Sequence, residues 1–132
     1  MTSPDSALPA YPPTIETVVD IRNCNPGGDL FGGWMLAQMD LAGAARAFAY
    51  AGNRVVTAGV TDVSFVKPVF SGDLLRFYTR IERIGRTSVH VMVDVWAQHE
   101  AQGPFEKTTK ALYSFVSVDG QFRPIPLPVQ AA

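Results

Sequence analysis

The amino-acid sequence predicts an α+β protein in which a long antiparallel β-sheet wraps around one central, apolar helix. Two observations support this prediction. Residues 34–51 are rich in strong helix formers and carry few polar side chains. Four long segments rich in β-branched residues follow them, separated by short turns, and a shorter segment of the same kind precedes them. The expected order of elements is therefore β-α-β-β-β-β.

The length of 132 residues is that of one domain, and a hydrophobic share of 47% is ordinary for a globular protein. Residues 1–13 contain four prolines and are expected to form a flexible arm. We expect a single domain over residues 14–126 and a C-terminal tail over residues 127–132.

The first strand is expected over residues 14–22, which are rich in β-branched side chains. A glycine-rich loop then leads into the helix over residues 34–51, and Gly52 suits a C-terminal cap. A helix that is apolar nearly all round is buried on most sides. Because a single five-stranded sheet cannot surround such a helix, we expect dimerisation to cover the rest.

The remaining strands are expected over residues 54–67, 74–84, 87–99 and 105–118. Valine occupies every second position from Val89 to Val95, which predicts one face turned toward the core. Because short turns join consecutive strands, we expect these four to form an antiparallel meander.

One acid interrupts the apolar helix. Asp40 lies two turns inside it, and the positions three and four residues away carry no basic side chain. Burying an unpaired carboxylate is costly, so Asp40 is a candidate functional group. The alternative is a satisfied buried acid that hydrogen-bonds to a neighbouring strand. Before Asp40 in the chain, Gly32 and Gly33 let another group come close to the backbone. Free N–H groups at a helix start also favour a negative charge nearby.

Charge and composition exclude several classes of protein. The formal net charge of −1 gives no electrostatic case for nucleic acid or an anionic membrane surface. The two histidines and the single Cys24 stand at no metal-ligand spacing, so we expect no metal and no internal disulfide. No signal sequence or membrane-spanning segment is expected, which predicts a cytoplasmic protein.

Several motifs occur together in one order along the chain. They are Asn25-Pro-Gly-Gly-Asp-Leu-Phe-Gly-Gly-Trp34, Gln38-Met-Asp40, the strand from Val55 to Phe65, Pro68 with Gly72-Asp73, and Gly85-Arg86-Thr87-Ser88. This combination, spread over residues 14–126, resembles the YciA-like acyl-CoA thioesterases, which have the hotdog fold. The resemblance implies hydrolysis of acyl-CoA to a free carboxylic acid and CoA, with no cofactor besides the CoA of the substrate.

The resemblance also implies roles for individual residues. Asp40 takes the place of the family's catalytic acid, as general base or nucleophile. Asn25 takes the place of an asparagine that positions water or substrate across a dimer from the aspartate of the other subunit. Backbone N–H groups near Gly32 and Gly33 would polarise the thioester carbonyl.

The turn formed by Gly85, Arg86, Thr87 and Ser88 corresponds to the turn that lies along CoA in this family. Arg86 offers a cation for the CoA phosphates, and the two hydroxyls add donors. The resemblance further suggests a dimer that assembles into a trimer of dimers. Thr61 and Lys110 stand where the family often carries acids, so the acyl-chain preference is left open.

Three other classes fit the sequence less well. A hotdog dehydratase needs a histidine paired with an acid, and neither the loop nor the helix contains a histidine; His90 and His99 are expected to be non-catalytic. A non-catalytic acyl-CoA-binding or sensing module would typically lack the helix acid. A purely structural β-protein leaves Asp40 unexplained. Asn25 and Arg86 also have simpler interpretations, as ordinary turn residues.

Overall fold

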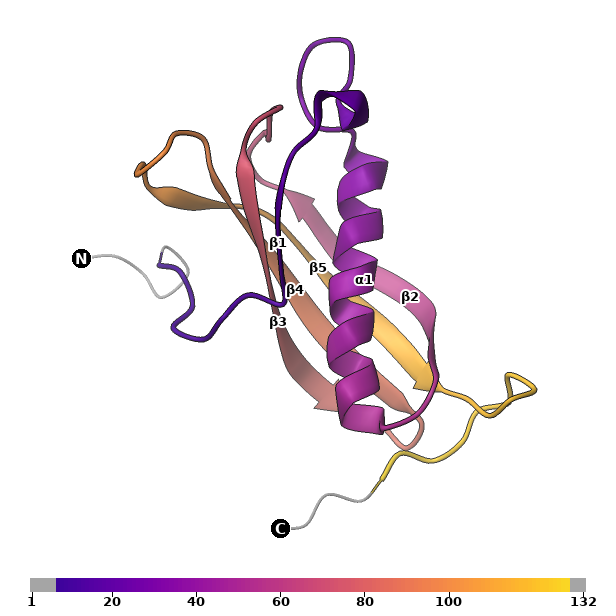
Figure 1. The fold of residues 1–132 in the computed structure, drawn as a ribbon. Coiled ribbons are helices and arrows are strands. Elements are labelled where there is room, and N and C mark those ends of the chain that lie inside the picture. Colours follow the sequence, from indigo (N-terminus) through magenta and orange to yellow (C-terminus); the bar gives the residue numbers. More distant parts are fainter. Residues whose placement is uncertain (1–6, 129–132) are drawn as a thin grey trace.

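The computed structural model describes residues 7–128, which form a five-stranded antiparallel sheet with one long helix across one face (Figure 1). Residues 1–6 of the predicted arm and residues 129–132 of the predicted tail lie outside the described residues. The elements are β1 (Ile15–Val18), the 3-10 helix η2 (Ile21–Asn23), α1 (Gly32–Ala51), β2 (Val55–Phe65), β3 (Leu74–Ile84), β4 (Ser88–Gln98) and β5 (Phe105–Ser117). The predicted order of strands and helix is confirmed.

The strand order in the sheet is β1-β3-β4-β5-β2. The meander therefore contains only β3, β4 and β5, and the prediction that β2 belongs to it is wrong: β2 pairs with β5 and forms an edge. The reason lies in residues 66–73, which form no tight hairpin. Leu30 donates its N–H to the carbonyl of Val69 (2.7 Å), so this segment packs on the glycine-rich loop before β3 begins.

The first strand is shorter than predicted. β1 ends at Val18, and the expected continuation to residue 22 is replaced by η2. The cause is local, because the carboxylate of Asp20 accepts the N–H of Arg22 (2.8 Å) and caps the 3-10 turn.

The helix packs on the sheet through small and flexible side chains. Its buried residues face the fully buried valines of β4; they are Met35, Met39, Ala42, Gly43, Ala47 and Ala51. A Cβ at Gly43 would lie 3.0 Å from the ring of Phe115, so this close approach favours glycine. The helix begins at Gly32, slightly earlier than predicted. Its expected cap is confirmed: Gly52 has φ 64° and donates its N–H to the Phe48 carbonyl (2.8 Å).

One side of the helix is left uncovered by the sheet. Leu41 and Phe48 of α1 are 60% and 56% exposed, and Val60, Val63 and Phe65 are exposed on the edge strand β2. This is the side of the helix for which the sequence predicts cover from a second copy, and the sheet of one chain does not cover it. Large exposed apolar side chains on neighbouring elements are typical of a contact surface. No helix among residues 7–128 is long and apolar enough to cross a membrane.

Candidate active site

The carboxylate of Asp40 lies where α1 passes the edge strand β2. Its Oδ1 accepts a hydrogen bond of 2.7 Å from the hydroxyl of Thr57. Asp40 is partly exposed in a single chain rather than buried, and its bond to Thr57 is the hydrogen bond to a neighbouring strand that the alternative interpretation predicts. No hydrogen-bond partner of its other oxygen, Oδ2, is found within residues 7–128. The acid is thus oriented by a strand while one oxygen stays free.

A second hydroxyl supports the same turn of the helix. Tyr113 of β5 donates a hydrogen bond of 2.6 Å to the carbonyl of Leu36. That carbonyl lies four residues before Asp40 and is therefore the helical acceptor of the Asp40 N–H. Burial raises the pKa of Tyr113 to about 12, and the nearby charge of Asp40 adds to the rise. The phenol consequently stays protonated and keeps its hydrogen bond to the turn that carries the acid.

Asn25 lies in the glycine-rich loop, on the wall of a cavity of about 330 Å³. Its side-chain amide donates to the carboxylate of Asp29 (3.0 Å), and its backbone N–H donates to the Asp29 carbonyl (2.7 Å). The apolar part of the wall includes Leu30, Met35 and Val69. The wall also carries the polar side chains of Asn25, Asp29, Lys67 and Thr109, and a cavity of this size that combines apolar and polar groups is typical of a small-molecule site.

The start of α1 has no side-chain cap. Phe31 occupies the N-cap position and carries no oxygen that could accept a hydrogen bond. Trp34 and Met35 donate their N–H groups to the Phe31 carbonyl, but in the described part of the chain no acceptor faces the N–H of Gly32 or Gly33. These two donors are available to a ligand, and the helix dipole favours negative charge there.

The structure brings together some of the predicted site residues and separates others. Asn25 and Gly32 line the same cavity. Asp40 follows Gly32 by eight residues, which corresponds to roughly 12 Å along a helix axis. Groups that act on one reacting atom lie roughly 3–3.5 Å from it. Within one chain, the helix-start donors and the carboxylate therefore cannot act on the same reacting group.

The predicted CoA-binding residues form the turn between β3 and β4. This turn lies at the end of the sheet opposite the glycine-rich loop (Figure 1). The Gly85 N–H donates to the Ser88 carbonyl (2.8 Å), and a Cβ at Gly85 would collide with the Ser88 hydroxyl. Arg86 is exposed, so its guanidinium is accessible to a ligand.

Both histidines are engaged away from these groups. His90 Nδ1 lies 2.8 Å from the Ser114 hydroxyl, and burial lowers the His90 pKa. His99 bridges the carboxylates of Asp73 (2.7 Å) and Glu106 (2.8 Å), and its hydrogen bond with Glu106 is the main reason that its pKa is raised. Among residues 7–128 no cluster of three His, Cys, Asp or Glu side chains could hold a metal ion.

Comparison with known proteins identifies the family to which the chain belongs. The family model of the thioesterase superfamily matches residues 27–103, more than half of the chain. The chain belongs to the thioesterase superfamily. It is 40% identical over 119 residues to the acyl-CoA thioester hydrolase YciA of Salmonella typhimurium, which covers 88% of this chain and 90% of that protein.

Solved structures of similar proteins share the fold. A hexameric thioesterase of Yersinia pestis superposes with a TM-score of 0.87 at 35% identity, covering 93% of this chain and all of that one. A hexameric hotdog fold thioesterase of Campylobacter jejuni gives a TM-score of 0.84 at 38% identity, covering 89% and 91% of the two chains. The predicted hotdog fold and the predicted kinship with YciA-like acyl-CoA thioesterases are confirmed.

Proposed function

We propose that this protein hydrolyses acyl-CoA thioesters to a free carboxylic acid and CoA, with Asp40 as the acid at the reacting centre. One observation carries the proposal. The Asp40 carboxylate is oriented by the Thr57 hydroxyl at 2.7 Å, and no Lys, Arg or His of residues 7–128 lies within ion-pair distance of it. The family of the chain and the name of its Salmonella relative support the same reaction.

Two routes use this carboxylate. As a general base, Asp40 takes a proton from water while the water oxygen attacks the thioester carbon. As a nucleophile, its own oxygen attacks and forms an anhydride that water then hydrolyses. In both routes the C–S bond breaks, and the CoA thiolate leaves and takes up a proton. The hydrogen bond from Thr57 holds the carboxylate in one orientation for either attack.

The remaining groups would stabilise the charge that develops on the carbonyl oxygen. The N–H groups of Gly32 and Gly33 and the amide of Asn25 are the donors that we assign to this role. Because roughly 12 Å of helix separates Gly32 from Asp40, we assign these donors to a second copy of the chain. The chemistry is then complete with a carboxylate, an amide and backbone N–H groups, so we propose no cofactor besides the CoA of the substrate.

The second copy would pair along the edge strand β2. A regular run, Gly59–Thr61, lies between two bulges near the middle of this strand, and Val60 within it is exposed. Antiparallel pairing of two such strands would lay the two helices side by side in opposite directions, so that each helix start approaches the other Asp40. The Yersinia and Campylobacter relatives are hexameric, and we propose a trimer of dimers here.

The test is thiol release from short, medium and long acyl-CoAs by the wild type, by Asp40→Asn and by Glu100→Gln. The control removes an exposed acid in the turn between β4 and β5, away from the edge strand β2. We expect Asp40→Asn to lose roughly 100-fold or more, the scale of a general base, and the control to keep its activity. Tight acyl-CoA binding without thiol release from any chain length would identify a binding module instead.

A further inference from the structure

An exposed aromatic ring lies at the end of the molecule opposite the glycine-rich loop. Phe122, in the segment after β5, is 62% exposed and has φ 61°. This left-handed conformation is rare for a bulky side chain, and such backbone outliers concentrate at functional sites. The guanidinium of Arg54 lies over the ring, 5.2 Å from its centroid. The ring is thus presented to solvent next to a cation.

The turn that carries Phe122 is rigidly built. The carboxylate of Asp119 accepts the N–H groups of Gln121 (2.9 Å) and Arg123 (3.0 Å), and the Asp119 N–H donates to the Arg123 carbonyl (2.9 Å). The turn is also tied to the start of β2, because Val118 donates its N–H to the Arg54 carbonyl (3.0 Å). The turn that carries Phe122 and the backbone of Arg54 are therefore held together, with the guanidinium over the ring.

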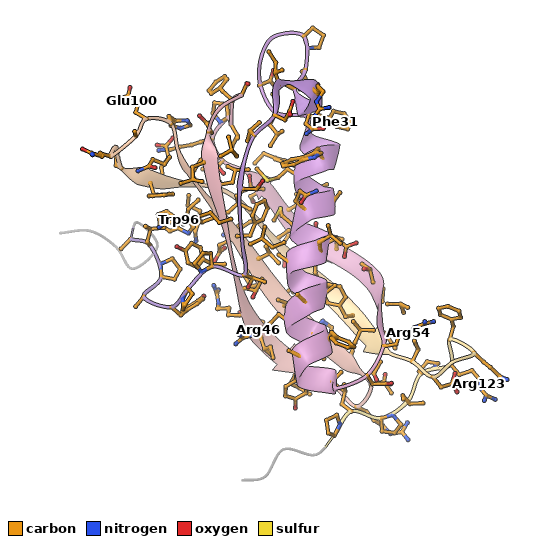
Figure 2. All side chains as sticks on the ribbon, in the orientation of Figure 1. Phe31, Arg46, Arg54, Trp96, Glu100 and Arg123 are labelled. Atoms are coloured by element: carbon orange, nitrogen blue, oxygen red, sulfur yellow. The ribbon has the colours of Figure 1, made fainter. Side chains whose placement is uncertain are left out.

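Three arginines gather at this end of the sheet. Figure 2 shows Arg54 and Arg123 on neighbouring segments, far from Phe31 at the start of the helix. Arg86 is linked to the same region because its carbonyl accepts the Leu127 N–H (2.9 Å). Arg123 pairs with Asp119 (3.1 Å), whereas no ion pair of Arg54 or Arg86 occurs within residues 7–128. The cluster, defined here as Arg54, Arg86, Phe122 and Arg123, carries excess positive charge beside an exposed aromatic face.

Along β2, the cluster is separated from the strand residue that holds Asp40. Thr57, which holds Asp40, follows Arg54 by three residues, or roughly 10 Å along a strand. In acyl-CoA the pantetheine arm separates the thioester from the adenine nucleotide and its phosphates. The nucleotide must therefore bind well away from Asp40, and β2 leads from Asp40 to the cluster.

We propose that this cluster binds the nucleotide end of CoA, with adenine stacked on Phe122 and the phosphates held by Arg54, Arg86 and Arg123. Aromatic side chains bind bases by stacking, and arginine binds phosphate through several parallel hydrogen bonds. The inference rests on the proposed thioesterase function and deepens it. It extends CoA recognition from the Gly85–Ser88 turn to Arg54 and to the segment after β5.

The experiment compares two substrates with the same acyl group: the acyl-CoA and the acyl-N-acetylcysteamine thioester, which lacks the nucleotide. The variants are Phe122→Gly, which keeps the left-handed turn accessible, and Arg54→Gln. The control is Arg76→Gln, which removes an arginine from a cation–π pair with Phe105 (4.3 Å) elsewhere on the sheet. We expect KM for acyl-CoA to rise about tenfold in each test variant with kcat retained, the size of one stacking or charged contact.

The truncated thioester separates binding from folding. Its kcat/KM should stay within about twofold of the wild type in both test variants, since it never reaches the cluster. An unchanged KM for acyl-CoA, an equal loss on both substrates, or the same loss in Arg76→Gln would overturn the inference. Calorimetric titration with CoA gives a readout independent of hydrolysis: weaker CoA binding by Phe122→Gly supports the cluster even if Asp40 proves not to be catalytic.

Discussion

The surroundings of Asn25 and of Asp40 differ in how far one chain completes them. Asn25 lines a cavity of about 330 Å³ between the glycine-rich loop, the start of α1 and the segment after β2, and its side chain is fixed by Asp29. Asp40 is held by a single hydroxyl on a helix flanked by exposed apolar side chains. The cavity is lined on several sides by one chain, whereas the carboxylate lies beside an apolar surface that the sheet leaves uncovered.

The catalytic site has to form where these two regions meet. The helix-start donors belong to the cavity and the carboxylate to the uncovered surface, about 12 Å apart along the helix. Covering the open side with a second copy would add apolar contacts and bring the missing donors at the same time. Assembly and catalysis are therefore expected to be coupled, and a variant in one region should spare the other.

The largest effect is expected at the edge strand. Val60→Asp places a charge on the surface that we assign to the dimer, where an unpaired buried carboxylate costs several kcal/mol. We expect loss of the oligomer in analytical ultracentrifugation and a fall in thioester hydrolysis of roughly 100-fold or more. The matched control is Val18→Asp, an exposed valine (59%) on the opposite edge strand β1. Equal effects of both variants would refute the assignment of the interface to β2.

A smaller effect is expected from the hydroxyl that orients Asp40. Thr57→Val keeps the shape of the side chain and removes its hydrogen bond to the carboxylate. We expect kcat to fall by about tenfold, the scale of one hydrogen bond to a charged group, while KM for acyl-CoA stays the same. Thr57→Ser restores the hydroxyl and should recover most of the rate. A valine variant as fast as the wild type would show that Asp40 needs no such support.

The smallest effect concerns the contacts of residues 66–69, the segment after β2 that lines the Asn25 cavity. His99 joins Asp73, next to that segment, to Glu106 of β5, and both carboxylates raise its pKa. A raised pKa means that protonated His99 stabilises the fold; this contribution is full below the unfolded pKa of about 6.5 and disappears as pH rises through the folded pKa.

His99→Gln should therefore lower the free energy of unfolding at about pH 6, by roughly 1 kcal/mol or less because the ring is partly exposed. The difference should shrink as the pH is raised through the folded pKa, with about pH 9 as the upper condition, since His99 loses its proton there in the wild type as well. Denaturant unfolding at both pH values measures it. A larger difference at the higher pH would contradict the role of the protonated ring.

Local patterns in the sequence predict most of the fold. Residues 74–84 form β3 with the predicted bounds, and the alternating valines of β4 are fully buried beneath the helix. The pairing of β2 was predicted wrongly because it depends on residues 66–73 packing against the glycine-rich loop, a contact between distant parts of the chain. Strand character is visible in a local pattern, whereas the neighbour of a strand is decided by tertiary contacts.

The site was predicted only in part for a similar reason. Asp40 stands out as an acid in an apolar helix, but Thr57 and Tyr113 support it from strands that are distant in the chain. One signal for Thr57 exists: it is a hydroxyl in a strand that follows the helix directly. The sequence does not show which turn of the helix lies beside this strand. The hydrogen bond between Thr57 and Asp40 is therefore seen only in the folded structure.

The most direct test of the central claim is complementation between two inactive variants. Asp40→Asn and Asn25→Ala chains, each with its own affinity tag, are co-expressed, and mixed oligomers are purified through both tags. If each site combines Asp40 of one copy with Asn25 of another, an intact site forms wherever the two variants pair, and thiol release should return to about a quarter of the wild-type rate for random pairing. Mixed oligomers no more active than the two variants alone would contradict a site shared between copies.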